Sequence, residues 1–224
     1  MEYFRRLLSV VVGVWWFKSL KNKKDMSLGS VLEKQAAKYK DKPLILFEDR
    51  VISYTLFNET ANRYSHLFQK RGFIKGDTVA ILMDNRPAFL IVHAGLSKIG
   101  VIPALVNSNI KGQTLAHAIN IAEARALVIG AEYLPEYLKI KKDVKLKKPG
   151  TIFIEPDNAP VKIPAGMENL KLLIATEPVS NPLLLPPINS KDTLEYIYTS
   201  GTTGLPKATE LKQQKWLQLR YGPG

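Results

Sequence analysis

Hydrophobic and polar residues recur along the first third of this chain with periods that predict a helix and then a hairpin. Residues 27–39 carry apolar side chains at helical spacing, and Ser30 with Glu33 predicts a capping box at the start of that helix. Short apolar runs at residues 44–47 and 51–54 surround a polar turn. That pattern is typical of a β-hairpin.

The middle of the chain predicts helices and strands in alternation. A helix capped by Thr55 and ended by Gly72 comes first. Apolar runs then predict strands at residues 79–83, 101–106 and 126–129, with helices at residues 87–99 and 114–122. The strands are continuously apolar, as expected when helices cover both faces of a sheet. We therefore expect an α/β fold with a doubly wound, mostly parallel sheet and flanking helices.

The next segment, residues 156–190, changes character because prolines are spread among short apolar pieces. An irregular connection is predicted there. A further strand is predicted at residues 194–198, directly before a run of hydroxyl-bearing residues and glycines.

Composition indicates a folded protein, since 46% of the 224 residues are hydrophobic and 23% are charged. The absence of cysteine excludes disulfides and thiolate chemistry. His66, His93 and His117 match no metal-binding spacing, so we predict helix-face or core positions for them and no identifiable metal site. The net charge of +12 favours anionic partners. No basic stripe is interleaved with aromatic residues, so nucleic acid is not predicted as a partner.

The N-terminus, residues 1–24, predicts a membrane anchor. Its apolar run at residues 7–17 would reach only about 17 Å as a helix, against about 30 Å of hydrocarbon in a bilayer. Trp15 and Trp16 beside several lysines suit the headgroup region, so residues 3–24 are expected to meet the membrane with the lysines facing the cytoplasm. The alternative is a helix packed on the protein's own core. A second basic run at residues 139–148 is predicted to be a solvated, lysine-rich helix or loop.

Residues 199–207 concentrate hydroxyl groups, two glycines and one lysine after the predicted strand. Gly201 and Gly204 permit backbone conformations in which successive amide groups converge on phosphate oxygens, and the hydroxyls add donors. Lys207 supplies a charge that would offset negative charge building on a departing pyrophosphate. The spacing is not GxxxxGK followed by Ser or Thr, because Pro206 separates Gly204 from Lys207. A phosphate-binding loop is predicted, and the alternative is an ordinary surface turn.

The string YTSGTTGLPK at residues 198–207 resembles the signature of the adenylate-forming, AMP-binding superfamily. Its flanks are similar to the fatty acid transport protein family, also called very-long-chain acyl-CoA synthetases. The likeness runs from residue 27 to residue 207 and includes residues 47–49, 76–77, 85–89, 95–100 and 104–109.

The resemblance implies a ligase that uses ATP, Mg²⁺ and coenzyme A. A fatty carboxylate attacks the α-phosphate of ATP, and the thiol of coenzyme A then displaces AMP. Ser200 would donate to phosphate, without acting as a nucleophile, and Lys207 would stabilise charge. The nucleotide-binding residues implied are Tyr196, Ile197, Tyr198, Thr199, Ser200, Gly201, Thr202, Thr203, Gly204, Leu205, Pro206 and Lys207.

After Ala208 the resemblance ends, because the family continues with an apolar strand whereas residues 209–220 are mostly polar. A polar run cannot lie in a sheet buried on both faces. We expect three segments: an anchor at residues 1–24, a truncated AMP-binding domain at residues 27–208 and a divergent tail at residues 209–224. The chain alone is expected to be inactive.

Two functional interpretations remain open. The first is the N-terminal portion of a fatty acyl-CoA synthetase that takes part in fatty acid uptake. The second is a non-catalytic, membrane-associated binding or interaction protein, in which oligomers are possible. Either is expected at the endoplasmic reticulum or plasma membrane, with its domain facing the cytoplasm.

Overall fold

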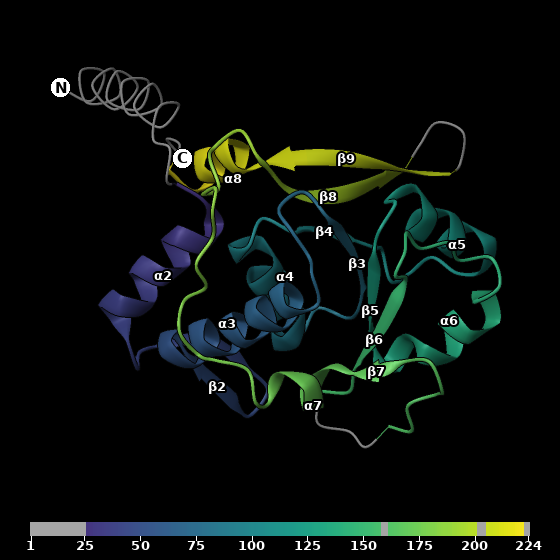
Figure 1. Cartoon of the computed structure of the whole chain (residues 1–224), viewed down its shortest axis with the longest axis horizontal. Helices are drawn as coiled ribbons and strands as arrows, with labels where there is room; N and C mark the ends of the chain where they lie inside the picture. Colours follow the sequence, from purple (N-terminus) through teal and green to yellow (C-terminus); the bar gives the residue numbers. More distant parts are fainter. Residues whose placement is uncertain (1–25, 158–160, 201–204, 222–224) are drawn as a thin grey trace.

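The computed structural model describes residues 26–157, 161–200 and 205–221, and helices cover both faces of its central sheet (Figure 1). The anchor predicted at residues 1–24 lies outside the described residues. Among the helices formed by the described residues, none is long and apolar enough to cross a membrane.

The central sheet has seven strands in the order β7-β6-β5-β3-β4-β8-β9. All neighbouring pairs are parallel except β8 and β9, which are antiparallel. The predicted α/β fold with a mostly parallel sheet is confirmed. The strands are β3 (Thr78–Leu82), β4 (Ile102–Leu105), β5 (Ala126–Gly130), β6 (Thr151–Glu155), β7 (Glu168–Asn169), β8 (Thr193–Ser200) and β9 (Pro206–Lys212).

Helices and a hairpin surround this sheet. The predicted hairpin is confirmed as a separate antiparallel pair of strands. These elements are β1 (Pro43–Phe47), β2 (Arg50–Ser53), α2 (Leu28–Tyr39), α3 (Tyr54–Lys70), α4 (Pro87–Lys98), α5 (Gly112–Ile121), η1 (Ala131–Tyr133), α6 (Leu134–Ile140), α7 (Leu170–Ile174) and α8 (Gln213–Tyr221).

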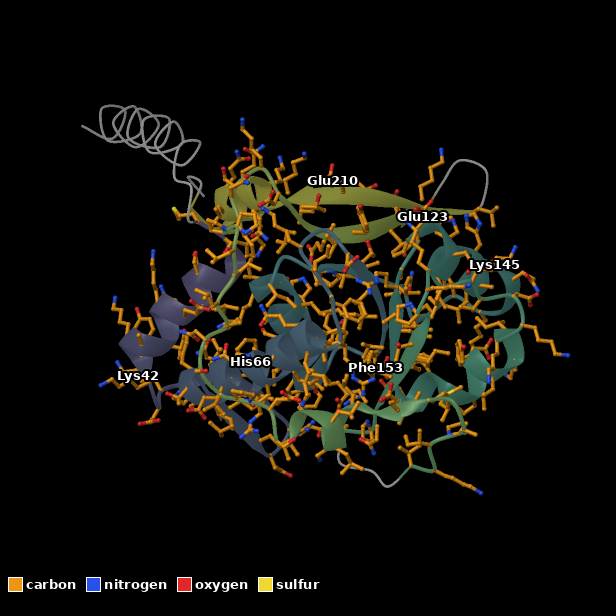
Figure 2. All side chains as sticks on the ribbon, in the orientation of Figure 1. Lys42, His66, Glu123, Lys145, Phe153 and Glu210 are labelled. Carbon is orange, nitrogen blue, oxygen red and sulfur yellow. The ribbon has the colours of Figure 1, made fainter. Side chains whose placement is uncertain are left out.

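Side-chain alternation along the strands divides the interior into two cores. In β3, Val79 and Ile81 pack in the core that contains α3, α4 and α7. The intervening Ala80 and Leu82 pack in the core that contains α5 and α6. Phe153 of β6 lies within the fold in Figure 2, where its ring contacts Phe68 of α3 at a centroid distance of 5.4 Å. Burial on both faces explains the continuously apolar strands.

Two predicted helix caps are wrong, because serines at the preceding turns cap the helices. The Ser27 hydroxyl accepts from the Ser30 amide at 3.2 Å, and Ser30 Oγ accepts from the Ser27 amide at 3.0 Å. The capping box therefore begins three residues earlier than predicted. In α3 the cap is Ser53, whose hydroxyl accepts from Leu56 N at 3.1 Å, and Thr55 lies inside the helix.

The segment predicted as irregular contains short elements. Residues 156–190 include β7 and α7, and β6 before them was not predicted. Most of the lysine-rich run is exposed, as predicted, and Lys145 lies near one end of the fold in Figure 2.

The polar run after residue 208 continues the sheet at its edge. Most side chains of β9 are exposed, so this strand avoids the burial that would exclude a polar sequence. Helix α8 then packs on the domain: Leu217 is buried, and Gln213 Oε1 accepts from Leu28 N at 2.9 Å. Strand β9 thus crosses the domain boundary predicted at residue 208.

Candidate functional site

Strand β8 carries the predicted phosphate-binding segment to the carboxyl edge of the sheet. It lies parallel to β4, with Ala104 opposite Tyr196 and Leu105 opposite Ile197. Strand β4 ends there, and the last three residues of β8 pair with β9 alone. The β8–β9 hairpin therefore projects past its parallel neighbour, at the edge where ligands bind in open α/β sheets.

Side chains on the two faces of β8 attach this strand to different helices. On one face, Glu195 Oε2 lies 2.6 Å from Nε2 of His93 in α4, and both side chains are largely buried. On the other face, the Tyr198 hydroxyl donates to the Ala118 carbonyl of α5 at 2.8 Å, and burial raises the pKa of Tyr198 above its ordinary value. These contacts fix the strand that precedes the predicted loop.

Lys207 is exposed on β9 and lies directly opposite Thr199 of β8, which is also exposed. Among the described residues no salt bridge involves Lys207, whereas Lys212 on the same strand lies 3.8 Å from Glu210. The ammonium group of Lys207 is therefore available to an anion. A phosphate is the anion for which the sequence pattern argues.

The structure brings together only the two sides of the predicted loop. Pro206 pairs with Ser200, and Leu205 is exposed. Tyr196 packs on the core that contains α5, whereas Ile197 on the opposite face of β8 is 39% exposed. Four residues predicted to form the loop lie outside the described residues: Gly201, Thr202, Thr203 and Gly204. The convergence of their amides on phosphate stays a prediction.

A cavity of about 920 Å³ opens elsewhere on the carboxyl edge and is lined mainly by charged residues such as Arg86, Glu132 and Asp157. A second, apolar cavity of about 150 Å³ lies beside it, between β1 and the start of α4. None of the described side chains of β8 or β9 lines either of these two cavities. The larger cavity is not predicted from the sequence, because its walls come from four turns that are far apart along the chain.

The histidines lie on helices, as predicted. His66 in α3 contacts the Ser180 carbonyl at 2.8 Å, His93 in α4 contacts Glu195, and His117 lies in α5. Within the described part of the chain there is no group of three His, Cys, Asp or Glu side chains that could hold a metal ion.

The fold and the strand pair together define a class of protein: an α/β domain whose mostly parallel sheet ends in the antiparallel strands β8 and β9, which flank a string of hydroxyl-bearing residues and glycines in the sequence. Residues 32–222 match the sequence family described as AMP-binding enzyme.

Curated relatives extend this match. The chain is 36% identical over 187 residues to Long-chain fatty acid transport protein 6 of Mus musculus, covering 81% of this chain and 29% of that protein. It is 29% identical over 192 residues to the Medium/long-chain-fatty-acid–CoA ligase FadD6 of Mycobacterium tuberculosis, covering 86% of this chain and 30% of that protein. The chain thus spans about a third of the length of these relatives.

Solved structures share the fold. The anthranilate CoA ligase AuaEII, in complex with anthranoyl-AMP, superposes with a TM-score of 0.77 at 20% identity, over 88% of this chain and 36% of that one. The N-terminal domain of FACL13 from Mycobacterium tuberculosis gives 0.71 at 23% identity, over 84% of this chain and 44% of that one. The chain belongs to the AMP-binding enzyme family, in its branch of fatty acid transport proteins and acyl-CoA synthetases, and corresponds to their N-terminal part.

Proposed function

We propose that this chain is the N-terminal portion of an ATP-dependent long- or very-long-chain fatty acyl-CoA synthetase. The observation that carries the proposal is the β8–β9 hairpin, which places exposed Thr199 opposite exposed Lys207 at the carboxyl edge of a mostly parallel sheet. The names of the curated relatives, fatty acid transport protein and fatty-acid–CoA ligase, supply the substrate class.

In this function the hairpin holds the triphosphate of ATP. Thr199 and Ser200, with the residues that follow, donate hydrogen bonds to phosphate oxygens, and Lys207 offsets the charge that builds on pyrophosphate as the fatty carboxylate attacks the α-phosphate. This step needs no enzyme nucleophile. A bond forms between a carboxylate oxygen and the α-phosphorus, and the bond between the α-phosphorus and the pyrophosphate oxygen breaks. The coenzyme A thiol then displaces AMP.

Mg²⁺ and coenzyme A are cosubstrates in this proposal, and no residue of the chain is assigned to either. The described residues hold no three-ligand cluster for a metal ion. The described part of the chain contributes the strand pair and its lysine.

The first experiment measures fatty-acid-dependent exchange of labelled pyrophosphate into ATP. A chimera in which residues 27–208 replace the matching part of mouse Long-chain fatty acid transport protein 6 is expected to catalyse exchange. The purified 224-residue chain is expected not to, because Thr199 and Lys207 are open to water, where such contacts contribute little. A chimera that folds but does not exchange contradicts the proposal.

The second candidate function is a non-catalytic, membrane-associated interaction protein. One observation favours it: β9 is an edge strand of the described sheet, so the backbone groups along its outer edge face no further strand of that sheet and can pair with another chain. Size-exclusion chromatography with light scattering tests it, since strand pairing between copies yields a dimer. In either function we propose membrane association through residues 3–24, at the endoplasmic reticulum or plasma membrane.

A further inference from the structure

The cavity of about 920 Å³ lies at the carboxyl edge of the sheet, away from the β8–β9 hairpin. Its walls come from the turn between β1 and β2 and from the segments that follow β3, β5 and β6. Its volume is within the range of small-molecule sites. The lining residues are Glu48, Asp49, Arg50, Asp84, Arg86, Ala131, Glu132, Pro156, Asp157 and Val161.

The chain path places this cavity where the strand order reverses. Strands β3 and β5 are neighbours, yet the chain leaves β3 toward α4 and leaves β5 toward α6. Helix α4 packs in one core and α6 in the other, so the two connections separate to opposite faces of the sheet. Such a point opens a crevice between strand ends, and ligands of open α/β sheets bind there.

Both signs of charge line the cavity, and the two guanidinium groups share one carboxylate. Asp157 Oδ1 lies 2.9 Å from Arg50 Nη1 and 3.4 Å from Arg86 Nη1. Glu132 Oε2 lies 3.3 Å from Arg86 Nη2. Three further carboxylates line the cavity. Glu48 Oε2 lies 3.9 Å from Arg50 Nη2, whereas Asp49 and Asp84 form no salt bridge with any described residue. Five carboxylates against two guanidiniums disfavour a phosphorylated ligand.

Arg86 is the buried group of this set. Its side chain is only 8% exposed, and Nη2 donates to the Glu155 carbonyl at 3.0 Å. Nη1 makes no hydrogen bond to any described group, although the Asp157 carboxylate is near. A buried guanidinium hydrogen without an acceptor is costly, so a ligand that offers one is favoured.

Carboxylates that accept hydrogen bonds, together with guanidinium groups that donate them, favour an uncharged ligand that can both donate and accept. A hydroxyl group does so: it donates to Asp49, Asp84 or Glu132 and accepts from a guanidinium. An ammonium group cannot accept, and a phosphate cannot donate to the carboxylates. We propose that this cavity is a binding site for a neutral, polyhydroxylated ligand, a sugar or ribose ring, held by carboxylates through its vicinal hydroxyls and oriented by Arg86.

Calorimetric titration of the whole 224-residue chain with methyl β-D-ribofuranoside tests this site. Millimolar binding is expected. Asp49→Ala should weaken it about tenfold, because a charge-assisted hydrogen bond is lost from an exposed turn. Ala131→Trp should abolish it by filling the cavity. Asp41→Ala, which removes a carboxylate from an exposed turn outside the cavity lining, should leave the affinity unchanged.

Other probes decide between ligand classes. Spermine binding more tightly than the glycoside would assign the cavity to a cation, and ribose 5-phosphate binding more tightly would assign it to an anion; either result overturns the proposal. No binding of the glycoside at millimolar concentration overturns it too, as does an affinity that Asp49→Ala and Ala131→Trp leave unchanged. Because Lys207 lies outside this cavity, the result is independent of pyrophosphate exchange.

Discussion

Lys98 illustrates how single side chains hold this fold together. Its side chain is fully buried at the end of α4, and its ammonium group contacts Glu33 Oε1 at 2.8 Å, Asn58 Oδ1 at 2.7 Å and Asn181 Oδ1 at 3.2 Å. Three acceptors match its three donors, so α2, α3 and the proline-rich segment are joined at one point. The sequence marks this lysine only as the end of an apolar helix, because its partners are distant in the chain.

We predict that Lys98→Met destabilises the protein by about 2 kcal/mol, because three polar partners lose their donor. Burial lowers the pKa of Lys98 below its ordinary value of 10.5, with Glu33 opposing the shift. At a pH between the lowered pKa and 10.5, Lys98 binds more protons in the unfolded chain than in the folded protein. The free energy of unfolding therefore rises with pH in that window.

Urea unfolding of wild type and Lys98→Met measures both effects. The stability difference in favour of wild type should grow as pH is raised toward 10.5. Lys34→Met, at an exposed position of α2, serves as the control and should change neither the stability nor its pH dependence. A difference that stays flat or shrinks with rising pH contradicts the account.

At the element scale, the sequence predicts what local periodicity controls. Apolar runs and breaker residues are local signals, and they predict strands β3, β4, β5 and β8 and the helices α4 and α5. Helices α6 and α7 are not predicted. Strand β6 was missed, since its five residues stand alone after a lysine-rich run, and its burial depends on packing against Phe68. The caps were misplaced because several hydroxyl residues compete near each helix start, and only the three-dimensional turn selects one.

The candidate site was predicted only in part for the same reason. The segment of residues 199–207 is one contiguous string, so its hydroxyls, glycines and lysine were recognisable. The contact between His93 and Glu195 and the cavity around Arg86 join residues far apart in the sequence. No local pattern marks such pairs.

We predict that His93→Ala destabilises the protein by about 2–3 kcal/mol, because it leaves the largely buried Glu195 carboxylate without its partner. His93→Gln keeps a donor within reach and should cost less. Tyr198→Phe, which removes one hydrogen bond to Ala118, should cost about 1 kcal/mol. Urea unfolding of the three variants ranks them, and equal costs for His93→Ala and His93→Gln would contradict a role for the contact with Glu195 in holding β8.

At the scale of the whole molecule, positive charge gathers in separate regions. Lys42 and Lys145 lie at opposite ends of the fold in Figure 2. Six further basic residues flank the apolar run of the predicted anchor: Arg5, Arg6, Lys18, Lys21, Lys23 and Lys24. Each lysine or arginine near an anionic surface contributes about 1 kcal/mol, so the anchor region should dominate membrane binding.

We predict that deleting residues 1–24 removes most sedimentation of the chain with vesicles containing phosphatidylserine. The charge control is a double variant, Lys141→Gln and Lys142→Gln, which lowers net charge in the exposed run after α6. That variant should sediment like wild type. Unchanged sedimentation of the deleted chain would mean that another surface binds the membrane.

In the proposed function, the hairpin of β8 and β9 holds the phosphates of ATP, and every step of the reaction depends on it. The most direct measurement is fatty-acid-dependent pyrophosphate exchange in a longer chimera that carries residues 27–212, so that the whole of strand β9 is included. We predict that Lys207→Ala lowers the exchange rate about 100-fold, since a charge that stabilises the transition state is lost. Lys212→Ala, on the same strand but adjacent to Glu210, should leave the rate unchanged. Equal rates for the Lys207→Ala and Lys212→Ala chimeras would contradict the account.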